Sequence, residues 1–141
     1  MCAAVLQCGA GVRYGLGVKP VPTWFIAVCW VMAVGYSICV GLQYNDPDPL
    51  RWIAIYGAAA VAMALLPARR VFVIPAVGVG LVAAIWGAYL GHQVKDTLYM
   101  SDLWLKMSEK GGAVEVGREA ADLGLVALTL LLTSGFRALR S

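Results

Sequence analysis

Two aspartates, Asp46 and Asp48, are the first acidic residues of the sequence. Each is followed by proline, and the amides of Gln43 and Asn45 come just before them. Carboxylate and amide oxygens are the ligands that Ca²⁺ and Mg²⁺ prefer in proteins. This first polar block (residues 43–48) separates two long apolar runs, so it is predicted to be a turn, a binding site or both.

A second polar block (residues 115–122) precedes the last apolar run and contains Glu115, Arg118, Glu119 and Asp122. Only 14 residues separate Asp122 from Arg137, which is about 21 Å of helix against a hydrocarbon core of about 30 Å. The helix must therefore begin earlier and include these charges in its first turns. Their spacing of three, four and seven residues places all four on one helix face.

One interpretation makes the two blocks a binding site. Both would converge at the mouth of a helix bundle and bind a divalent cation, a polar ligand or a partner protein. Ionisable residues within a membrane are functional candidates by default, because their burial is costly. The candidate metal ligands are Asp46, Asp48, Glu115 and Glu119, and the wider polar cluster adds Gln43, Asn45 and Arg118.

The other interpretation makes the same residues structural. Asp48 would cap the following helix, and Asp46 would shape the turn. Arg118 would pair with Asp46 or with Glu115 and so connect the last helix to the turn. Both interpretations are compatible with the sequence.

Three aromatic residues, Trp52, Tyr56 and Trp86, are predicted to pack at the membrane interface or to line a pocket beneath the acidic residues. His92 is the only histidine, so the sequence contains no haem-ligand pair and no zinc motif. No G-x-S-x-G, H-E-x-x-H or P-loop motif occurs. The enzymatic alternative is therefore a small metal-dependent membrane enzyme that uses the carboxylates named above.

The composition indicates a membrane protein. Hydrophobic residues make up 61% of the 141 residues and charged residues 13%, whereas soluble domains have roughly 45–50% and about 25%. Cys29 and Cys39 belong to no C-x-x-C pair, and we expect them to be small apolar residues. The expected partner is the lipid bilayer, and a homo-oligomer or a larger membrane complex is compatible with it. Nucleic acid is not expected, because no basic run contains interleaved aromatic residues.

Four apolar runs predict an all-α fold, an integral membrane four-helix bundle that forms one domain over residues 20–141. About 20 apolar residues are enough to cross the hydrocarbon core as a helix. Pro49 favours a helix start, and Pro67 favours a helix end just before it. The expected helices cover about residues 23–43, 49–66, 71–91 and 114–136.

Small residues recur at helical spacing on the second and third helices. The link over residues 67–70 is so short that these two helices are predicted to form an antiparallel hairpin. Small faces let helices approach each other closely in lipid. The predicted faces are Ala54, Ala58 and Ala62 on one helix and Gly80, Ala84 and Ala88 on the other, with Gly87 and Gly91 as a G-x-x-x-G pair.

Two further segments lie outside the predicted helices. Residues 1–19 are Gly-rich and contain no acid, which predicts a disordered basic tail or, alternatively, an organelle transit peptide. In residues 96–110, leucines alternate with charges around Trp104. This pattern predicts a short amphipathic helix at the interface or a structured loop.

The charges are sorted between the two sides of the predicted bundle. Four spans place both termini and the 67–70 turn on one side, which carries six Lys and Arg residues and no acid. The other side carries all eight acids and the remaining five Lys and Arg residues. The positive-inside rule predicts that both termini are cytoplasmic, or lie in the equivalent interior of an organelle. Both polar blocks would then lie on the opposite face.

The polar blocks resemble the signature of the transmembrane protein 220 family. The first match comprises Gln43, Asn45-Asp46-Pro47-Asp48, Trp52 and Tyr56, and the second comprises Glu115, Gly117-Arg118-Glu119 and Gly124. Trp86 also stands where the family has tryptophan, whereas Val116 departs from the more acidic residues of other members. The resemblance covers roughly residues 24–132. It implies a small multi-pass membrane protein and no particular reaction, so the expected function is non-enzymatic binding or the role of an accessory subunit.

Overall fold

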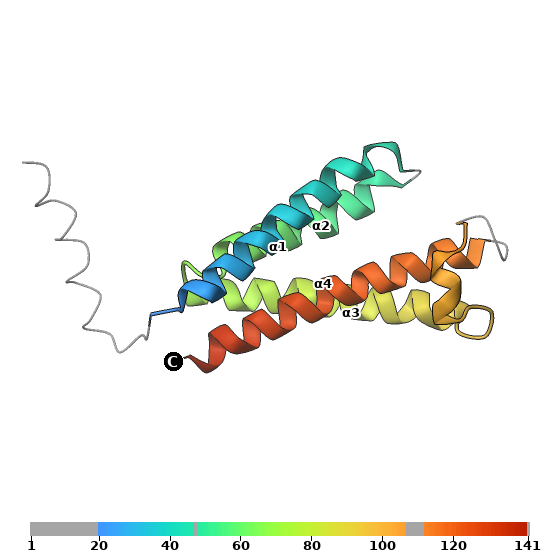
Figure 1. Ribbon diagram of the computed structural model, residues 1–141. Helices are drawn as coiled ribbons and strands as arrows, with labels where there is room; N and C mark the ends of the chain where they lie inside the picture. Colours follow the sequence, from blue (N-terminus) through green and yellow to red (C-terminus); the bar gives the residue numbers. More distant parts are fainter. Residues whose placement is uncertain (1–19, 47, 107–111, 141) are drawn as a thin grey trace, which may run out of the picture.

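The computed structural model describes residues 20–46, 48–106 and 112–140, and this part of the chain is all-helical (Figure 1). Its four α-helices are α1 (Thr23–Leu42), α2 (Pro49–Leu65), α3 (Val73–Val94) and α4 (Ala113–Leu139). The connections contain three 3-10 helices, namely η2 (Gln43–Asn45), η3 (Arg70–Phe72) and η4 (Met100–Trp104). The four predicted helices are confirmed, and no helix end differs from its prediction by more than three residues.

The helices suit a membrane in length and in surface. The segments Thr23–Asn45, Arg70–Val94 and Ala113–Leu139 are long and apolar enough to cross it. Helix α2 is apolar but has 17 residues, or about 25 Å of helix, which is near the lower limit for a span. Large apolar side chains are exposed on the outside of the bundle, as Leu132 is in α4. The protein is a multi-pass membrane protein.

The four helices pair as two hairpins, α1 with α2 and α3 with α4 (Figure 1). The hairpins meet at the end that contains η3, Pro20 and Arg140, and they diverge toward the end that contains η2 and η4 (Figure 1). We call the end where the hairpins meet the closed end, and the end where they diverge the open end. The prediction that α2 and α3 form the closely packed hairpin is wrong, because α3 packs mainly on α4.

Two glycines explain why α3 pairs with α4. A Cβ atom at Gly80 would lie 3.1 Å from the side chain of Leu131. A Cβ atom at Gly87 would lie 3.1 Å from Leu123 Cβ and 3.2 Å from the Ala120 carbonyl oxygen. Close approach of two helices in lipid depends on such small residues. The buried small residues of this contact on α3 are Ala76, Gly80, Ala83 and Gly87.

The predicted small-residue faces are only partly those that the fold uses. Ala62 and Gly80 are buried, whereas Ala54 and Ala88 are exposed. Residues that are always four positions apart are displaced by about 40° around the helix at each step, because four residues exceed one helical turn of 3.6 residues. The contact that forms alternates steps of three and four residues and so stays on one side of the helix.

Side chains of α1 and α4 join the two hairpins. Near the closed end, Phe25 stacks on Phe136 with ring centroids 5.0 Å apart. Further along, the Tyr36 hydroxyl and Thr129 Oγ1 form a hydrogen bond. Interhelical hydrogen bonds of this kind contribute about 0.6–2 kcal/mol in a membrane. Tyr36 is thus a link between the hairpins before they separate toward the open end.

The predicted amphipathic helix over residues 96–110 does not form in the described part of that segment, which has a turn followed by the five-residue η4. Leu98 and Leu103 are used in another way, because their side chains pack against the backbone of Gly117 in α4. A side chain at Gly117 would overlap Leu98. The alternative prediction of a structured loop therefore describes residues 96–106 correctly. Residues 107–110 and the predicted tail over residues 1–19 lie outside the described residues.

Candidate functional site

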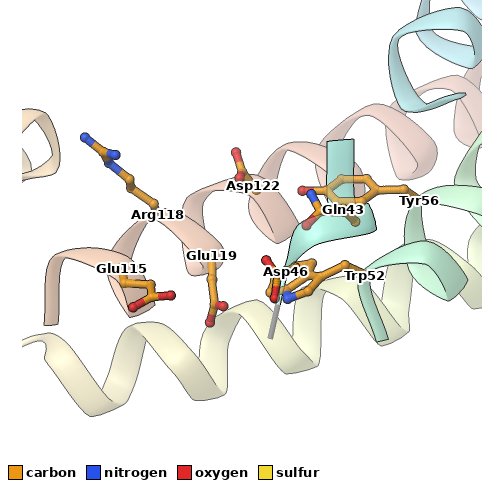
Figure 2. Close-up of a pocket in the computed structure, with 8 residues that line it drawn as sticks. All are labelled: Gln43, Asp46, Trp52, Tyr56, Glu115, Arg118, Glu119 and Asp122. Carbon is orange, nitrogen blue, oxygen red and sulfur yellow. The ribbon is translucent and has the colours of Figure 1, made fainter. Parts of the chain in front are cut away.

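A pocket of about 180 Å³ lies between the two hairpins at the open end (Figure 2). Residues from η2 and the turn after it, from the first turns of α2 and from the first three turns of α4 line it. The two polar blocks thus meet at one pocket, although 69 positions separate Asp46 from Glu115. The lining residues are Gln43, Asp46, Trp52, Tyr56, Glu115, Arg118, Glu119 and Asp122.

The first polar block contributes two side chains to the pocket, Gln43 and Asp46. Asp46 also shapes the turn as predicted, because its Oδ1 accepts a hydrogen bond from the Asp48 backbone N–H at 3.1 Å. Asn45 and Asp48 do not line the pocket, and both are exposed. The first block is therefore divided between the pocket and the outer surface.

The prediction that the Asp48 side chain caps α2 is wrong. Asp48 does occupy the N-cap position and Pro49 the first helical position, but the Asp48 carboxylate makes no capping hydrogen bond. It pairs instead with Arg51, one helical turn later, at 2.5 Å. Both side chains of this pair are more than half exposed, at 63% for Asp48 and 56% for Arg51. Water competes for exposed pairs, so this contact contributes only about 0–1 kcal/mol.

The second polar block lies along α4, as its spacing predicts, and brings four ionisable side chains to the pocket. Helix α4 begins at Ala113, which confirms that the last helix includes these charges in its first turns. Figure 2 shows Glu115 and Glu119 on one side of α4 and Asp122 nearer to Tyr56. The Asp122 carboxylate lies close enough to the Tyr56 hydroxyl to interact with it. Asp122 is not among the predicted metal ligands, although its spacing of seven residues from Glu115 places it on the same helix face.

Arg118 does not make the predicted pair with Asp46 or Glu115. Its Nε donates a hydrogen bond to the Leu103 carbonyl at 2.7 Å, and its Nη2 donates to the Leu105 carbonyl at 3.0 Å. These carbonyls belong to the end of η4, where helical partners are missing. The guanidinium is accordingly directed away from the other residues of the pocket (Figure 2). Arg118 fixes the loop to α4 and leaves the pocket carboxylates without its hydrogen bonds.

Trp52 and Tyr56 form the apolar wall of the pocket, and both are buried. Trp86 does not line the pocket but packs on this wall, since its ring stacks on Trp52 with centroids 5.1 Å apart. The row continues from Trp52 to Tyr56 at 5.9 Å and from Tyr56 to Tyr36 at 6.2 Å. The wall is therefore held by a continuous stack of rings across α1, α2 and α3. His92 lies apart from it, near Lys95 Nζ at 3.3 Å.

The described donor set does not fit a metal ion held by the protein alone. Among the described residues, no group of three or more His, Cys, Asp or Glu side chains is close enough together to bind one metal. The suggested ligands Asp46, Asp48, Glu115 and Glu119 are divided between the pocket and the exposed Asp48. What the pocket offers is four carboxylates and the two rings of Trp52 and Tyr56.

Comparison with known proteins identifies the family of the chain. The family model described as "Transmembrane family 220, helix" matches residues 35–134. The matched region contains both polar blocks, the aromatic wall and the contact between α3 and α4. No match was found among curated proteins or among solved structures. The match covers well over half of the sequence and includes every residue of the pocket, so the chain belongs to Transmembrane family 220.

Proposed function

We propose that this protein is a non-enzymatic membrane protein that binds a small organic cation in the pocket between its hairpins. The observation that carries the proposal is the charge of the pocket lining. Four carboxylates line the pocket, and the one cationic side chain that lines it, Arg118, gives two hydrogen bonds to backbone carbonyls of the loop. The ligand would offset the excess of negative charge in the lining.

Electrostatics favours a cation strongly at this position. Glu115 and Glu119 are four residues apart on α4, and like charges at this spacing repel each other. Asp46, on the opposite hairpin, also repels Glu119, and Arg51 offsets this repulsion only in part because Glu115 acts on Glu119 more strongly. The repulsion grows as water is excluded, because the effective dielectric constant falls. A bound cation would remove this repulsion and draw the two hairpins together at the open end.

The chemical class of the cation follows from the two halves of the lining. The buried rings of Trp52 and Tyr56 supply an apolar surface, and the carboxylates of Glu119 and Asp122 supply the charge. Ligand pockets typically combine an apolar wall with a few polar groups that fix orientation. An ammonium group that carries a short apolar substituent matches both halves. A bare metal ion would leave the wall unused.

The alternative function is a small metal-dependent membrane enzyme that uses the same carboxylates. It needs a set of ligands that converges on one ion, which the described donor set does not supply. We therefore favour binding over catalysis. A role as an accessory subunit is compatible with the proposal if the cation belongs to a side chain of a partner protein.

The proposal includes an orientation. Both termini and the closed end would face the cytoplasm, or the equivalent interior of an organelle, because this side carries Lys and Arg without acids. The pocket would then open toward the opposite face. Its ligand would come from outside the cytoplasm.

Thermal unfolding of the purified protein in detergent tests the proposal, with tetramethylammonium chloride as the probe and NaCl at the same concentration as the reference. We expect tetramethylammonium to raise Tm by about 2 °C or more over Na⁺, because a ligand that binds only the folded state stabilises it. Glu119→Gln should abolish this difference. Asp96→Asn, which removes one exposed carboxylate outside the pocket, should leave it unchanged.

Three results would contradict the proposal. Equal Tm values in the two salts would show that the pocket does not select an organic cation. An unchanged difference in Glu119→Gln would place the binding elsewhere. A rise in Tm with CaCl₂ or MgCl₂ that EDTA reverses, without an effect of tetramethylammonium, would favour the metal-dependent alternative.

A further inference from the structure

The closed end of the bundle carries an excess of positive charge that the described chain does not neutralise. Four arginines gather there from the link between α2 and α3 and from the end of α4. The sequence contains no Asp or Glu in residues 1–45, 49–95 or 123–141, so no acidic side chain belongs to this end. The four residues, which we call the arginine cluster, are Arg69, Arg70, Arg137 and Arg140.

The helix dipoles at the closed end do not provide the missing negative charge. Helices α2 and α4 end there, and each carries about half a negative charge at its C-terminus. Helices α1 and α3 begin there, and each carries about half a positive charge at its N-terminus. These contributions cancel to a first approximation. The arginine side chains therefore set the charge of the closed end.

Arg137 is the unusual member of the cluster, because it is buried with 5% of its surface exposed. Its Nε donates a weak hydrogen bond to the Leu66 carbonyl at 3.4 Å, and its Nη1 has no hydrogen-bond partner among the described residues. Arg70 lies near enough to repel it electrostatically. A buried charge is costly unless a group of opposite charge is close by. An anion at the closed end would therefore stabilise Arg137.

The other arginines connect the chain segments of the closed end through neutral backbone groups. Arg70 Nη2 donates to the Ala138 carbonyl at 2.7 Å, and Arg140 Nη1 donates to the Pro20 carbonyl at 3.5 Å. The Arg140 guanidinium also lies over the Phe136 ring, 5.0 Å from its centroid. These contacts fix the positions of the charges but contribute no counter-charge. Arg69 is exposed.

The aromatic residues around the cluster place it at the depth of lipid headgroups. Trp24 is 56% exposed and lies 5.0 Å from Phe136 between ring centroids. Exposed tryptophan near a helix end is typical of the membrane–water interface. At this depth the nearest available anions are lipid phosphates, and arginine recognises phosphate well because its planar donors match the phosphate oxygens.

From this placement we propose that the arginine cluster is a binding site for the headgroup of an anionic phospholipid. The lipid phosphate accepts hydrogen bonds from the accessible guanidinium groups and neutralises the field at Arg137. The acyl chains lie along the apolar outer surface of the bundle. This site is separate from the pocket at the open end, and it does not depend on the function proposed for that pocket.

The test uses the full chain in a neutral detergent and follows thermal unfolding by tryptophan fluorescence. The added probes are dioleoylphosphatidylglycerol, dioleoylphosphatidylcholine and inorganic phosphate. We expect phosphatidylglycerol to raise Tm by about 3 °C more than phosphatidylcholine, because it binds the folded state. Inorganic phosphate at millimolar concentration should have no such effect, since it lacks the acyl chains that hold the headgroup at the interface.

Two variants with the same change of net charge separate the cluster from a general charge effect. Arg69→Gln/Arg140→Gln removes two charges from the closed end. It should reduce the advantage of phosphatidylglycerol, meaning its extra rise in Tm over phosphatidylcholine, by more than half. Lys95→Gln/Lys106→Gln removes two exposed charges from the open end and should retain it. Arg69→Gln alone keeps every hydrogen bond described above, and it should reduce the advantage without changing Tm in the absence of lipid.

The proposal is overturned if the two lipids give the same Tm or if both double variants lose the advantage equally. A full effect of inorganic phosphate would overturn the assignment to a phospholipid and identify free phosphate as the ligand. If Arg69→Gln/Arg140→Gln does not fold, the result for Arg69→Gln alone decides.

Discussion

Arg118 of α4 donates a hydrogen bond from Nε to the carbonyl oxygen of Leu103 at 2.7 Å. This bond, together with the one from Nη2 to the Leu105 carbonyl, fixes the loop that follows α3 onto the start of α4. The guanidinium therefore makes no hydrogen bond to the carboxylates beside it on α4, although it lies near enough to Asp122 to attract it electrostatically.

Replacement of Arg118 should destabilise the protein through the loop. Hydrogen bonds from a charged donor contribute about 1.5–3 kcal/mol each at most, and partial exposure reduces this value. We expect Arg118→Ala to cost about 2 kcal/mol, and Arg118→Lys to recover only part of the loss because lysine lacks the planar fork. Thermal unfolding in detergent measures both effects.

The double variant Asp46→Asn/Arg118→Ala distinguishes this account from an ion pair across the pocket. Since Arg118 does not pair with Asp46, the added Asp46→Asn substitution should not restore the stability that Arg118→Ala removes. If the double variant recovers most of the stability lost in Arg118→Ala, the two side chains do interact in the membrane.

The contact between α3 and α4 should be sensitive to one methyl group at Gly87. An added Cβ would lie 3.1 Å from Leu123 Cβ and 3.2 Å from the backbone carbonyl oxygen of Ala120, which cannot easily move. We expect Gly87→Ala to cost about 1–3 kcal/mol, as overpacking does elsewhere. Unfolding in sodium dodecyl sulfate, followed by circular dichroism, measures the change.

Gly78 is the matched control in the same helix, because nothing lies within 4 Å of an added Cβ there. Gly78→Ala should be neutral or slightly stabilising, since alanine favours a helix over glycine by about 1 kcal/mol. Equal effects of the two substitutions would mean that the close contact of α3 with α4 does not form.

Substitutions at Asp48 should have small and similar effects. A capping role predicts that Asp48→Asn is silent and that Asp48→Ala costs about 1 kcal/mol. The exposed pair with Arg51 predicts that both substitutions cost about 0–1 kcal/mol and that the difference between them is small. Thermal unfolding of these variants and of Arg51→Gln checks this expectation. A clear advantage of asparagine over alanine would restore the capping role.

The orientation of the chain can be measured by cysteine labelling in intact cells. In a background without Cys2, Cys8, Cys29 and Cys39, a single cysteine is placed at position 69 or at position 104. Because the closed end carries the unopposed positive charge, we expect a membrane-impermeant maleimide to label position 104 and to label position 69 only after permeabilisation. Labelling of position 69 in intact cells would reverse the proposed orientation.

The sequence by itself determined the helices, because the length of an apolar run and the nearest prolines are local properties. The runs that became α1 and α3 had to cross the membrane as helices, since only a helix satisfies its backbone polar groups in lipid. The charges of α4 had to enter its first turns, because 14 residues between Asp122 and Arg137 are too few to span. Spacing alone also placed Glu115, Glu119 and Asp122 on one face.

Only the tertiary structure decided which helices pair and which groups the charged side chains contact. Gly80 and Gly87 give α3 a face that another helix can approach closely. In the structure, Leu131 and Leu123 of α4 pack against this face. In the same way, the sequence offered Arg118 several hydrogen-bond acceptors, and the position of the end of η4 decided which of them it contacts. Packing and hydrogen bonding between distant segments depend on shape in three dimensions, which a local pattern of residues does not contain.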